Sequence, residues 1–205
     1  MPSGQDTSFA RLVSLACHDL RTPLATVHGF ARTISRRGEL AEPESRYVAM
    51  IEAASDQLAE LLEELSLAAR IEGGRYEPTF QDTDSLALAT AAAAGLEAGL
   101  VSVDGTGAPL AVDVPAVERA LRALARCALR HGGLEHVGVR VAGLEVAITP
   151  ITPASAPVVL GEDLRDLGAA VAVRVLRELG GSVSLDGEAL RVGLPTEAAA
   201  TAGGP

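Results

Sequence analysis

Two long stretches of the chain repeat their apolar residues at alternating steps of four and three. In the first stretch, residues 9–37, the repeated positions are Phe9, Val13, Ala16, Leu20, Pro23, Val27, Phe30 and Ile34. In the second, residues 44–72, they are Tyr47, Ile51, Ala54, Leu58, Leu61, Leu65 and Ala68. This spacing is typical of helices that pack along a narrow seam. Gly38 and Pro43 indicate a short turn between the stretches, so we predict an antiparallel helical hairpin.

Each predicted helix carries an apolar stripe that a single partner helix cannot cover well. Two hairpins paired about a two-fold axis would cover these stripes in a four-helix bundle. We therefore predict a homodimer, with residues 8–76 as the dimerisation domain.

A different pattern begins after Gly73-Gly74 and the polar residues that run to Asp84. Helices are predicted at 85–99, 115–131 and 164–179, and short strands at 100–103, 110–112, 137–141, 144–148, 182–185 and 189–194. The fold class is thus a helical hairpin followed by an α/β sandwich with a mixed sheet over residues 82–196. The Ala/Gly-rich residues 197–205 are predicted to form a flexible tail.

Composition excludes several classes of function. Aromatic residues make up 2% of the chain, too few for a surface that stacks nucleic-acid bases, and the net charge of −10 disfavours nucleic acids and anionic membranes. The N-terminus has no signal-peptide pattern, and the apolar run 86–103 is too diluted to span a bilayer. The two cysteines, Cys17 and Cys127, form no CxxC pair, which favours a reducing cytoplasm.

His18 is the first candidate functional residue. If Ala16 and Leu20 lie on the seam, His18 lies on the opposite, solvent-facing side of the helix. Asp19 is adjacent, and Thr22 follows one turn later on the same face as His18. A neutral imidazole is a nucleophile, and a carboxylate that holds one ring nitrogen leaves the other free to attack phosphorus. The nearby hydroxyl of Thr22 could orient a water molecule that hydrolyses a phosphoryl group.

The run His18-Asp19-Leu20-Arg21-Thr22-Pro23-Leu24, followed by Gly29-Phe30, resembles the H-box of the HisKA dimerisation and phosphoacceptor domain of histidine kinases. Residues 69–75 resemble the family's exit from its second helix, so the resemblance covers about residues 8–78. It implies that His18 is phosphorylated, that Asp19 is its acid/base partner, and that Thr22 positions water. It also implies apolar contacts from Leu24, Val27 and Ala31 to a docked receiver domain.

The second half resembles a degenerate GHKL-type ATPase domain in the order of its elements. Three positions depart from that family's pattern. Cys127 stands where the resemblance expects a magnesium-binding asparagine, and a thiol is a poor ligand for this hard cation. Residues 149–153, TPITP, replace the adenine-binding Asp-x-Gly-x-Gly, and residues 167–172, LGAAVA, replace a glycine-rich phosphate loop with helix. We therefore expect no cofactor on this chain: no ATP, and magnesium only on a partner receiver.

Three functions are consistent with these features. The leading hypothesis is a phosphorelay histidine phosphotransferase, in which His18 shuttles a phosphoryl group between receiver-domain aspartates of response regulators. An upstream hybrid kinase is a further candidate partner. The second hypothesis is a histidine kinase, or its cytoplasmic catalytic fragment, that autophosphorylates on His18 with ATP. The third is a non-catalytic dimeric adaptor that binds a response regulator.

The remaining histidines and cysteines are interpreted as structural. His131 and His136 suggest a metal pair only by their spacing, and we predict no metal site and two solvated histidines in the loop at the end of a helix. Cys17 is predicted to be a small residue that fills space beside the seam.

Overall fold

The computed structural model describes residues 4–37 and 40–195. The chain divides into two compact units, Met1–Tyr76 and Glu77–Pro205. The tail predicted at 197–205 lies outside the described residues. Among the residues described, no helix is both long enough and apolar enough to cross a membrane.

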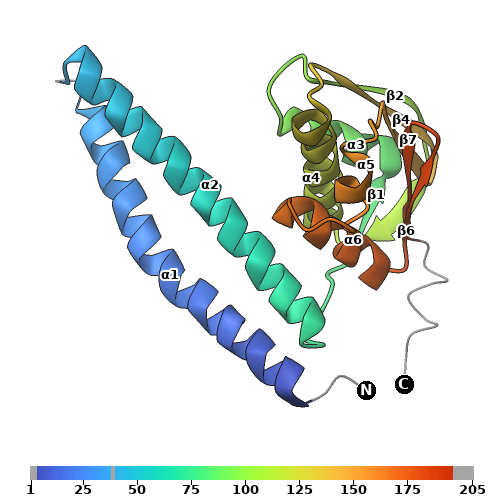
Figure 1. The fold of residues 1–205 in the computed structure, drawn as a ribbon, viewed down its shortest axis with the longest axis horizontal. Helices are drawn as coiled ribbons and strands as arrows, with labels where there is room; N and C mark the ends of the chain where they lie inside the picture. The colour runs from blue at the N-terminus through green and yellow to red at the C-terminus, as the bar shows by residue number, and fades with distance from the viewer. Residues whose placement is uncertain (1–3, 38–39, 196–205) are drawn as a thin grey trace. The chain divides into compact units, whose positions relative to one another are not determined.

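The first unit is an antiparallel pair of long helices, α1 (Gly4–Arg36) and α2 (Glu42–Glu72), which confirms the predicted hairpin (Figure 1). Pro43 lies in the first turn of α2, where the missing N–H of a proline leaves no helical bond unmade. The helix ends at Glu72, and the N–H of the capping residue Gly73 donates to the carbonyl of Ala69. Gly74 follows in a left-handed conformation with φ of 60°, which favours glycine.

The contact between α1 and α2 is made mainly by residues beside the predicted apolar stripe of α1, which runs from Phe9 to Ile34. The buried side chains of α1 are Ala10, Cys17 and Ala31, which lie at multiples of seven residues from one another. Of the larger stripe residues of α1, Phe9, Leu20 and Phe30 are more than half exposed within one chain, and Ile34 is 42% exposed. Small residues let the two helices approach closely, and this leaves the large apolar residues of the stripe facing outward.

The second unit is an α/β domain with a five-stranded sheet and a separate two-stranded ribbon. Its elements are β1 (Gln81–Asp84), α3 (Ser85–Ala94), β2 (Val101–Gly107), β3 (Pro109–Val112), α4 (Val114–Gly132), β4 (Val137–Gly143), β5 (Glu145–Thr149), α5 (Ala156–Val159), α6 (Leu167–Glu178), β6 (Ser182–Asp186) and β7 (Ala189–Gly193). The large sheet has the strand order β2-β4-β5-β7-β6, with β2 parallel to β4 and the other pairs antiparallel. The predicted mixed sheet is confirmed.

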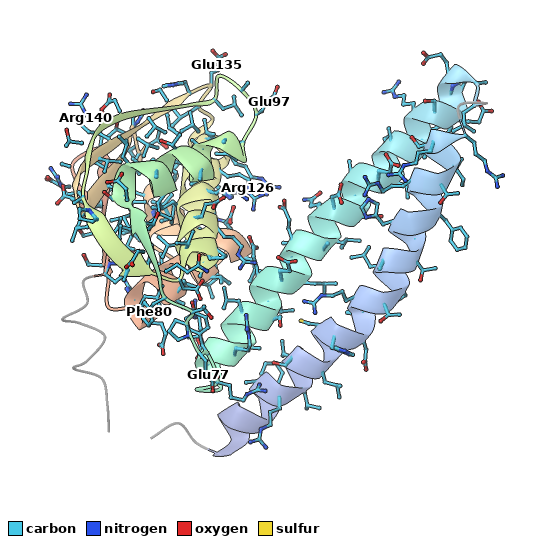
Figure 2. All side chains as sticks on the ribbon, turned by 180° about the vertical axis from the view of Figure 1, so that it is seen from behind. Glu77, Phe80, Glu97, Arg126, Glu135 and Arg140 are labelled. Atoms are coloured by element: carbon cyan, nitrogen blue, oxygen red, sulfur yellow. The ribbon has the colours of Figure 1, made fainter. Side chains whose placement is uncertain are left out.

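One face of the sheet is covered by the helices, and the core lies between them (Figure 1). Alternate residues of β4 and β5 are buried, as expected for strands with one covered face. On the open side, Arg140 of β4 pairs with Asp104 of β2 at 2.9 Å (Figure 2).

Ser85 ties three segments of this domain together. Its side chain is fully buried; Oγ donates to the carbonyl of Gly143 at 2.6 Å and accepts from the N–H of Ala108 at 2.9 Å. Gly105 of β2 makes another close contact, because a Cβ at this position would overlap the backbone of Val141 on the paired strand.

Several predicted boundaries differ from the structure. The helix predicted at 85–99 ends at Ala94, before Gly95, and the helix predicted at 164–179 begins at Leu167. The side chain of Asp166 accepts a hydrogen bond from the N–H of Ala169, which fixes this start. Strand β1 and the short helix α5 were not predicted. β1 consists only of polar residues, so it has no apolar alternation.

Candidate functional site

His18 lies in the first half of α1, on the side of the helix that is open to solvent. Its side chain is 76% exposed, whereas the adjacent Cys17 is buried against α2. One helical step of about 100° separates the two, so the packing that buries Cys17 turns His18 outward. The predicted exposure of His18 and the space-filling role of Cys17 both agree with this arrangement.

Asp19 forms a hydrogen bond with the imidazole of His18. The distance from Nδ1 to Oδ1 is 3.2 Å, and the Asp19 side chain is 68% exposed. A carboxylate only accepts, so this contact places a proton on Nδ1. In the neutral ring the lone pair is then on Nε2, which becomes the nitrogen able to attack an electrophile.

Thr22 lies one turn after His18 and is also exposed. Positions four residues apart share a helix face, so the hydroxyl of Thr22 is on the same side as the imidazole. The carbonyl of Thr22 accepts a hydrogen bond from Oγ1 of Thr26 at 3.1 Å. All three predicted site residues therefore lie together on one exposed surface, and their chemical roles stay predictions.

Of the three apolar residues predicted to contact a docked receiver domain, two are accessible to a second protein and one is buried. Val27 is half exposed and Leu24 is partly exposed, so both are available to a second protein. Ala31 is only 4% exposed because it packs in the hairpin, and its predicted contact with a partner is wrong. His28, beside Val27, forms an ion-pair contact with Asp56 of α2 at 3.4 Å.

A second cluster of reactive side chains joins α4 to the start of α6. It contains Cys127 and His131 of α4 and Asp166, the residue just before α6. The sulfur of Cys127, a ring nitrogen of His131 and a carboxylate oxygen of Asp166 all lie within 4.8 Å of one another. Nε2 of His131 is 3.2 Å from Oδ2 of Asp166. His131 lies in the last turn of α4, at the end of the predicted helix, but the prediction that it is solvated is wrong, because its side chain is only 18% exposed. His136 is exposed, as predicted.

The thiol of Cys127 is strongly affected by this environment. Burial, and secondly the negative charge of Asp166, raise the pKa of the Cys127 thiol from 9.0 to about 12. Three arginines, Arg130, Arg126 and Arg165, act in the opposite direction. The thiol therefore remains protonated at neutral pH in the absence of a bound cation.

In the segment between β5 and α6, Thr152 and Ser155 form hydrogen bonds with each other. Ser155 is fully buried; its Oγ accepts from the N–H of Thr152 at 3.1 Å and donates to the Thr152 carbonyl at 3.2 Å. After this turn, Gly168 and the alanines that follow it are buried within α6, which packs against α4. The expected helix over 167–172 is confirmed.

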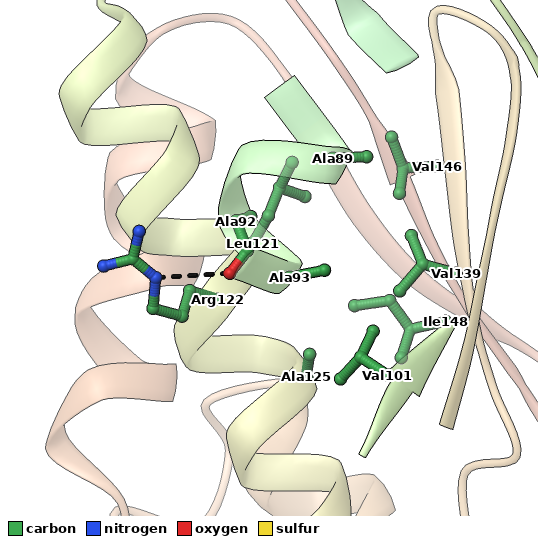
Figure 3. A pocket seen from close by; sticks show the side chains of 10 residues that line it. All are labelled: Ala89, Ala92, Ala93, Val101, Leu121, Arg122, Ala125, Val139, Val146 and Ile148. Atoms are coloured by element: carbon green, nitrogen blue, oxygen red, sulfur yellow. Dashed lines mark hydrogen bonds between the residues drawn. The ribbon is translucent and has the colours of Figure 1, made fainter. Parts of the chain in front are cut away.

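A small cavity lies between α3, α4 and the sheet (Figure 3). Its lining is alanine, valine, leucine and isoleucine, with Arg122 at one end donating from Nε to the carbonyl of Ala92 at 3.2 Å. The volume is about 10 Å³, comparable to the space for one water molecule. This cavity is far too small for a nucleotide.

The hairpin is similar in sequence to known proteins. Residues 10–74 match the family model of the His Kinase A (phospho-acceptor) domain. Over 70 residues the chain is 31% identical to a curated protein of Mycobacterium tuberculosis (strain ATCC 25618 / H37Rv) described as a probable sensor histidine kinase, TcrY. The alignment covers 34% of this chain and 15% of that relative, so the chain spans a small part of the relative's length.

Solved structures resemble the chain over both units. The crystal structure of full-length ShkA in complex with AMPPNP has a TM-score of 0.62 at 20% identity, covering 89% of this chain and 44% of that one. The Acinetobacter baumannii histidine kinase AdeS has a TM-score of 0.52 at 19% identity, covering 85% of this chain and 94% of that one. At these identities the likeness concerns the fold. The chain thus carries a hairpin that matches the His Kinase A (phospho-acceptor) domain over residues 10–74, followed by an α/β domain whose fold is similar to those of ShkA and the histidine kinase AdeS.

Proposed function

We propose that the chain relays phosphoryl groups in a two-component system, with His18 as the residue that carries them. The observation that carries the proposal is the exposed imidazole of His18, oriented by Asp19 within a phospho-acceptor domain. A second protein can reach this ring without any movement of the hairpin, because 76% of the side chain is open to solvent.

The proposed step begins with an aspartyl phosphate on a response-regulator receiver domain. Nε2 of His18 attacks the phosphorus, a P–N bond forms, and the bond from phosphorus to the carboxyl oxygen of the receiver breaks. The receiver carboxylate leaves with the electron pair of that bond. Asp19 keeps its hydrogen bond to Nδ1–H and stabilises the positive charge that develops on the ring. The reverse step passes the group to a second receiver.

Thr22 has a separate role in the proposal. Its hydroxyl is one turn from the imidazole and exposed, where it can hold a water molecule near a phosphorylated partner. Loss of this hydroxyl should affect hydrolysis of the phosphoryl group more than its transfer.

The donor is proposed to be a receiver aspartate because the residues of the α/β domain do not fit magnesium–ATP. Cys127 offers a protonated sulfur where a hard cation needs oxygen. The segment after β5 has neither an aspartate nor paired glycines at residues 149–153. The stretch at 167–172 is helix in place of a glycine-rich loop, and the N–H groups of Ala169 and Ala170 are already bonded to Asp166. Magnesium would come with the receiver.

A histidine kinase that uses ATP is the second candidate, and the comparisons fit it better than they fit a phosphotransferase. The curated relative is described as a probable sensor histidine kinase, and one structural neighbour is a complex with AMPPNP. Calorimetric titration of the chain with magnesium and AMPPNP separates the candidates. Saturable binding would favour the kinase; no binding would favour the relay.

The apolar surface of the hairpin supports a homodimer. Apart from Phe80, Leu164 and Leu185, the large apolar side chains that are exposed among the described residues lie on α1 and α2. Patches of this kind mark interaction surfaces. We propose that two hairpins cover them in a four-helix bundle, and that the dimer works in the cytoplasm, where its two free cysteines stay reduced.

The function is tested by incubating the chain with a panel of receiver domains phosphorylated with labelled acetyl phosphate. We expect acid-labile label on the wild-type chain and none on a His18→Gln variant that remains folded. Failure of every receiver in the panel to label the chain, or equal labelling of His18→Gln, would contradict the proposal.

A further inference from the structure

The side chains of Cys127, His131 and Asp166 offer a sulfur, a nitrogen and an oxygen to a common point between α4 and α6. Cys127 and His131 are four residues apart and so project from the same face of α4. Asp166 reaches them from the N-terminus of α6, 35 residues further along the chain than His131. We propose that these three residues bind a divalent transition-metal ion, with zinc as the ion that fits best.

Zinc fits the donor set because it is borderline soft and accepts thiolate, imidazole and carboxylate ligands together. Its bonds of about 2.0–2.3 Å place the ligand atoms of a tetrahedral site about 3.3–3.8 Å apart. Nε2 of His131 and Oδ2 of Asp166 are already 3.2 Å apart. With the three ligand atoms within 4.8 Å of one another, closing the site needs side-chain movements of about 1 Å.

The carboxylate of Asp166 is held in place by the helix that follows it. Oδ1 accepts the hydrogen bond from the N–H of Ala169 at 3.0 Å, and Oδ2 is directed at His131. One oxygen thus fixes the side chain while the other is available to a cation. Cys127 is fully buried, but the side chains of His131 and Asp166 are 18% and 12% exposed, which leaves a side for entry and for a fourth ligand from water.

Binding is balanced by the loss of one proton. The metal takes the thiolate of Cys127, whose proton goes to the solvent. The proton that Nε2 of His131 shares with Asp166 moves to Nδ1, so the imidazole stays neutral and Nε2 is free to bind. Two coordinate bonds then replace the hydrogen bond between His131 and Asp166. A thiolate and a carboxylate together neutralise the charge of a divalent ion. The bound ion would join α4 to the N-terminus of α6, where the hydrogen bond between His131 and Asp166 now lies. This inference does not depend on phosphoryl transfer at His18.

The test is a titration of the metal-stripped chain with cobalt(II), followed by displacement with zinc(II). Cobalt bound to a thiolate gives a sulfur-to-metal charge-transfer absorption, which reports on Cys127 directly. We expect one cobalt ion per chain with this absorption, its loss on adding zinc, and a rise in the thermal unfolding midpoint with zinc.

Three ligand variants and three controls make the result specific. Cys127→Ser should abolish the charge-transfer absorption, and His131→Gln and Asp166→Asn should weaken binding roughly 100-fold or more, because changes outside a ligand set already cost about 10- to 100-fold. Asp166→Asn keeps an acceptor for the cap of α6. The controls Cys17→Ser, His136→Gln and His18→Gln should bind as the wild type does.

Two results would overturn the proposal. One is a folded wild-type chain that shows no sulfur-to-cobalt absorption at millimolar cobalt. The other is an absorption that persists in Cys127→Ser or an affinity unchanged in His131→Gln. The metal ligands and the relay residue His18 are different side chains. A failure of metal binding therefore leaves the proposed relay function standing, and a failure of phosphoryl relay leaves the proposed metal site standing.

Discussion

The Asp19→Asn substitution keeps the size of the side chain next to His18 and removes its negative charge. An amide can donate to Nδ1 as well as accept from it, so the variant no longer holds the proton on Nδ1 and allows the tautomer that protonates Nε2, the nitrogen that must attack phosphorus. Positioned acid/base groups typically contribute about 100- to 10,000-fold to a rate. We expect phosphorylation of His18 to slow by this factor.

Stability should respond very differently to the same change. The two side chains are 76% and 68% exposed, and ion pairs this open to solvent contribute about 0–1 kcal/mol after screening. The unfolding free energy of Asp19→Asn should therefore stay within about 1 kcal/mol of the wild type. A structural role for Asp19 would predict parallel losses of stability and rate, whereas a chemical role predicts a loss of rate alone.

The assay uses phosphoramidate as a small phosphoryl donor, so that it depends on neither a receiver nor ATP. Phosphorylated and free chain are separated on a phosphate-affinity gel over time, and urea unfolding gives the stability. Asp104→Asn is the matched control, since it removes an equally exposed carboxylate that pairs with Arg140 in the other unit. The reasoning is refuted if Asp19→Asn reacts at the wild-type rate, or if Asp104→Asn slows as much.

Three further predictions follow from buried or apolar positions. Ser85→Ala strands the two buried backbone groups that its hydroxyl joins, so urea unfolding should show a loss of about 1–3 kcal/mol; an unchanged midpoint would contradict this. Gly105→Ala should lose about 1–3 kcal/mol or more, since φ is +119° and the added Cβ meets the backbone of β4; wild-type stability would count against it. Leu58→Glu should raise the monomer fraction in light scattering, because the exposed leucine lies on the apolar surface of the hairpin. Gln57→Glu, which adds the same charge one residue earlier, should leave the dimer intact, and equal effects of the two changes would argue against that surface.

The hairpin could be predicted from the sequence because steps of four and three residues occur only where a helix presents a continuous face. Which residues of that face touch α2 could not be predicted. Cys17 and Leu20 are neighbours on the helix surface, and the small residue packs within the chain while the large one stays exposed. Close approach of two backbones favours small side chains, a preference that a count of apolar positions does not contain.

The α/β domain was predictable where a pattern is local. Strands β4 and β5 alternate apolar and polar residues, and α4 has a clear apolar face. Strand β1 was missed because all its side chains are polar, so it has no apolar alternation. Its pairing with β3 is made by backbone hydrogen bonds, which leave no pattern in the sequence.

The metal-type cluster was missed for a related reason. His131 and Cys127 show the helical spacing of a ligand pair, but the third member, Asp166, is brought to them only by the packing of α6 against α4. A pattern within one helix cannot supply a partner from another. The same packing partly buries His131, which was predicted to be solvated at the end of its helix.

The central claim is that His18 receives its phosphoryl group from another protein and not from ATP. The most direct measurement offers the purified chain labelled ATP with magnesium in one reaction and a labelled, phosphorylated receiver domain in the other. We predict acid-labile label on the wild-type chain from the receiver only, and on His18→Gln from neither. Stable label at His18 from ATP, with its absence in His18→Gln, would contradict the account and identify the chain as a kinase.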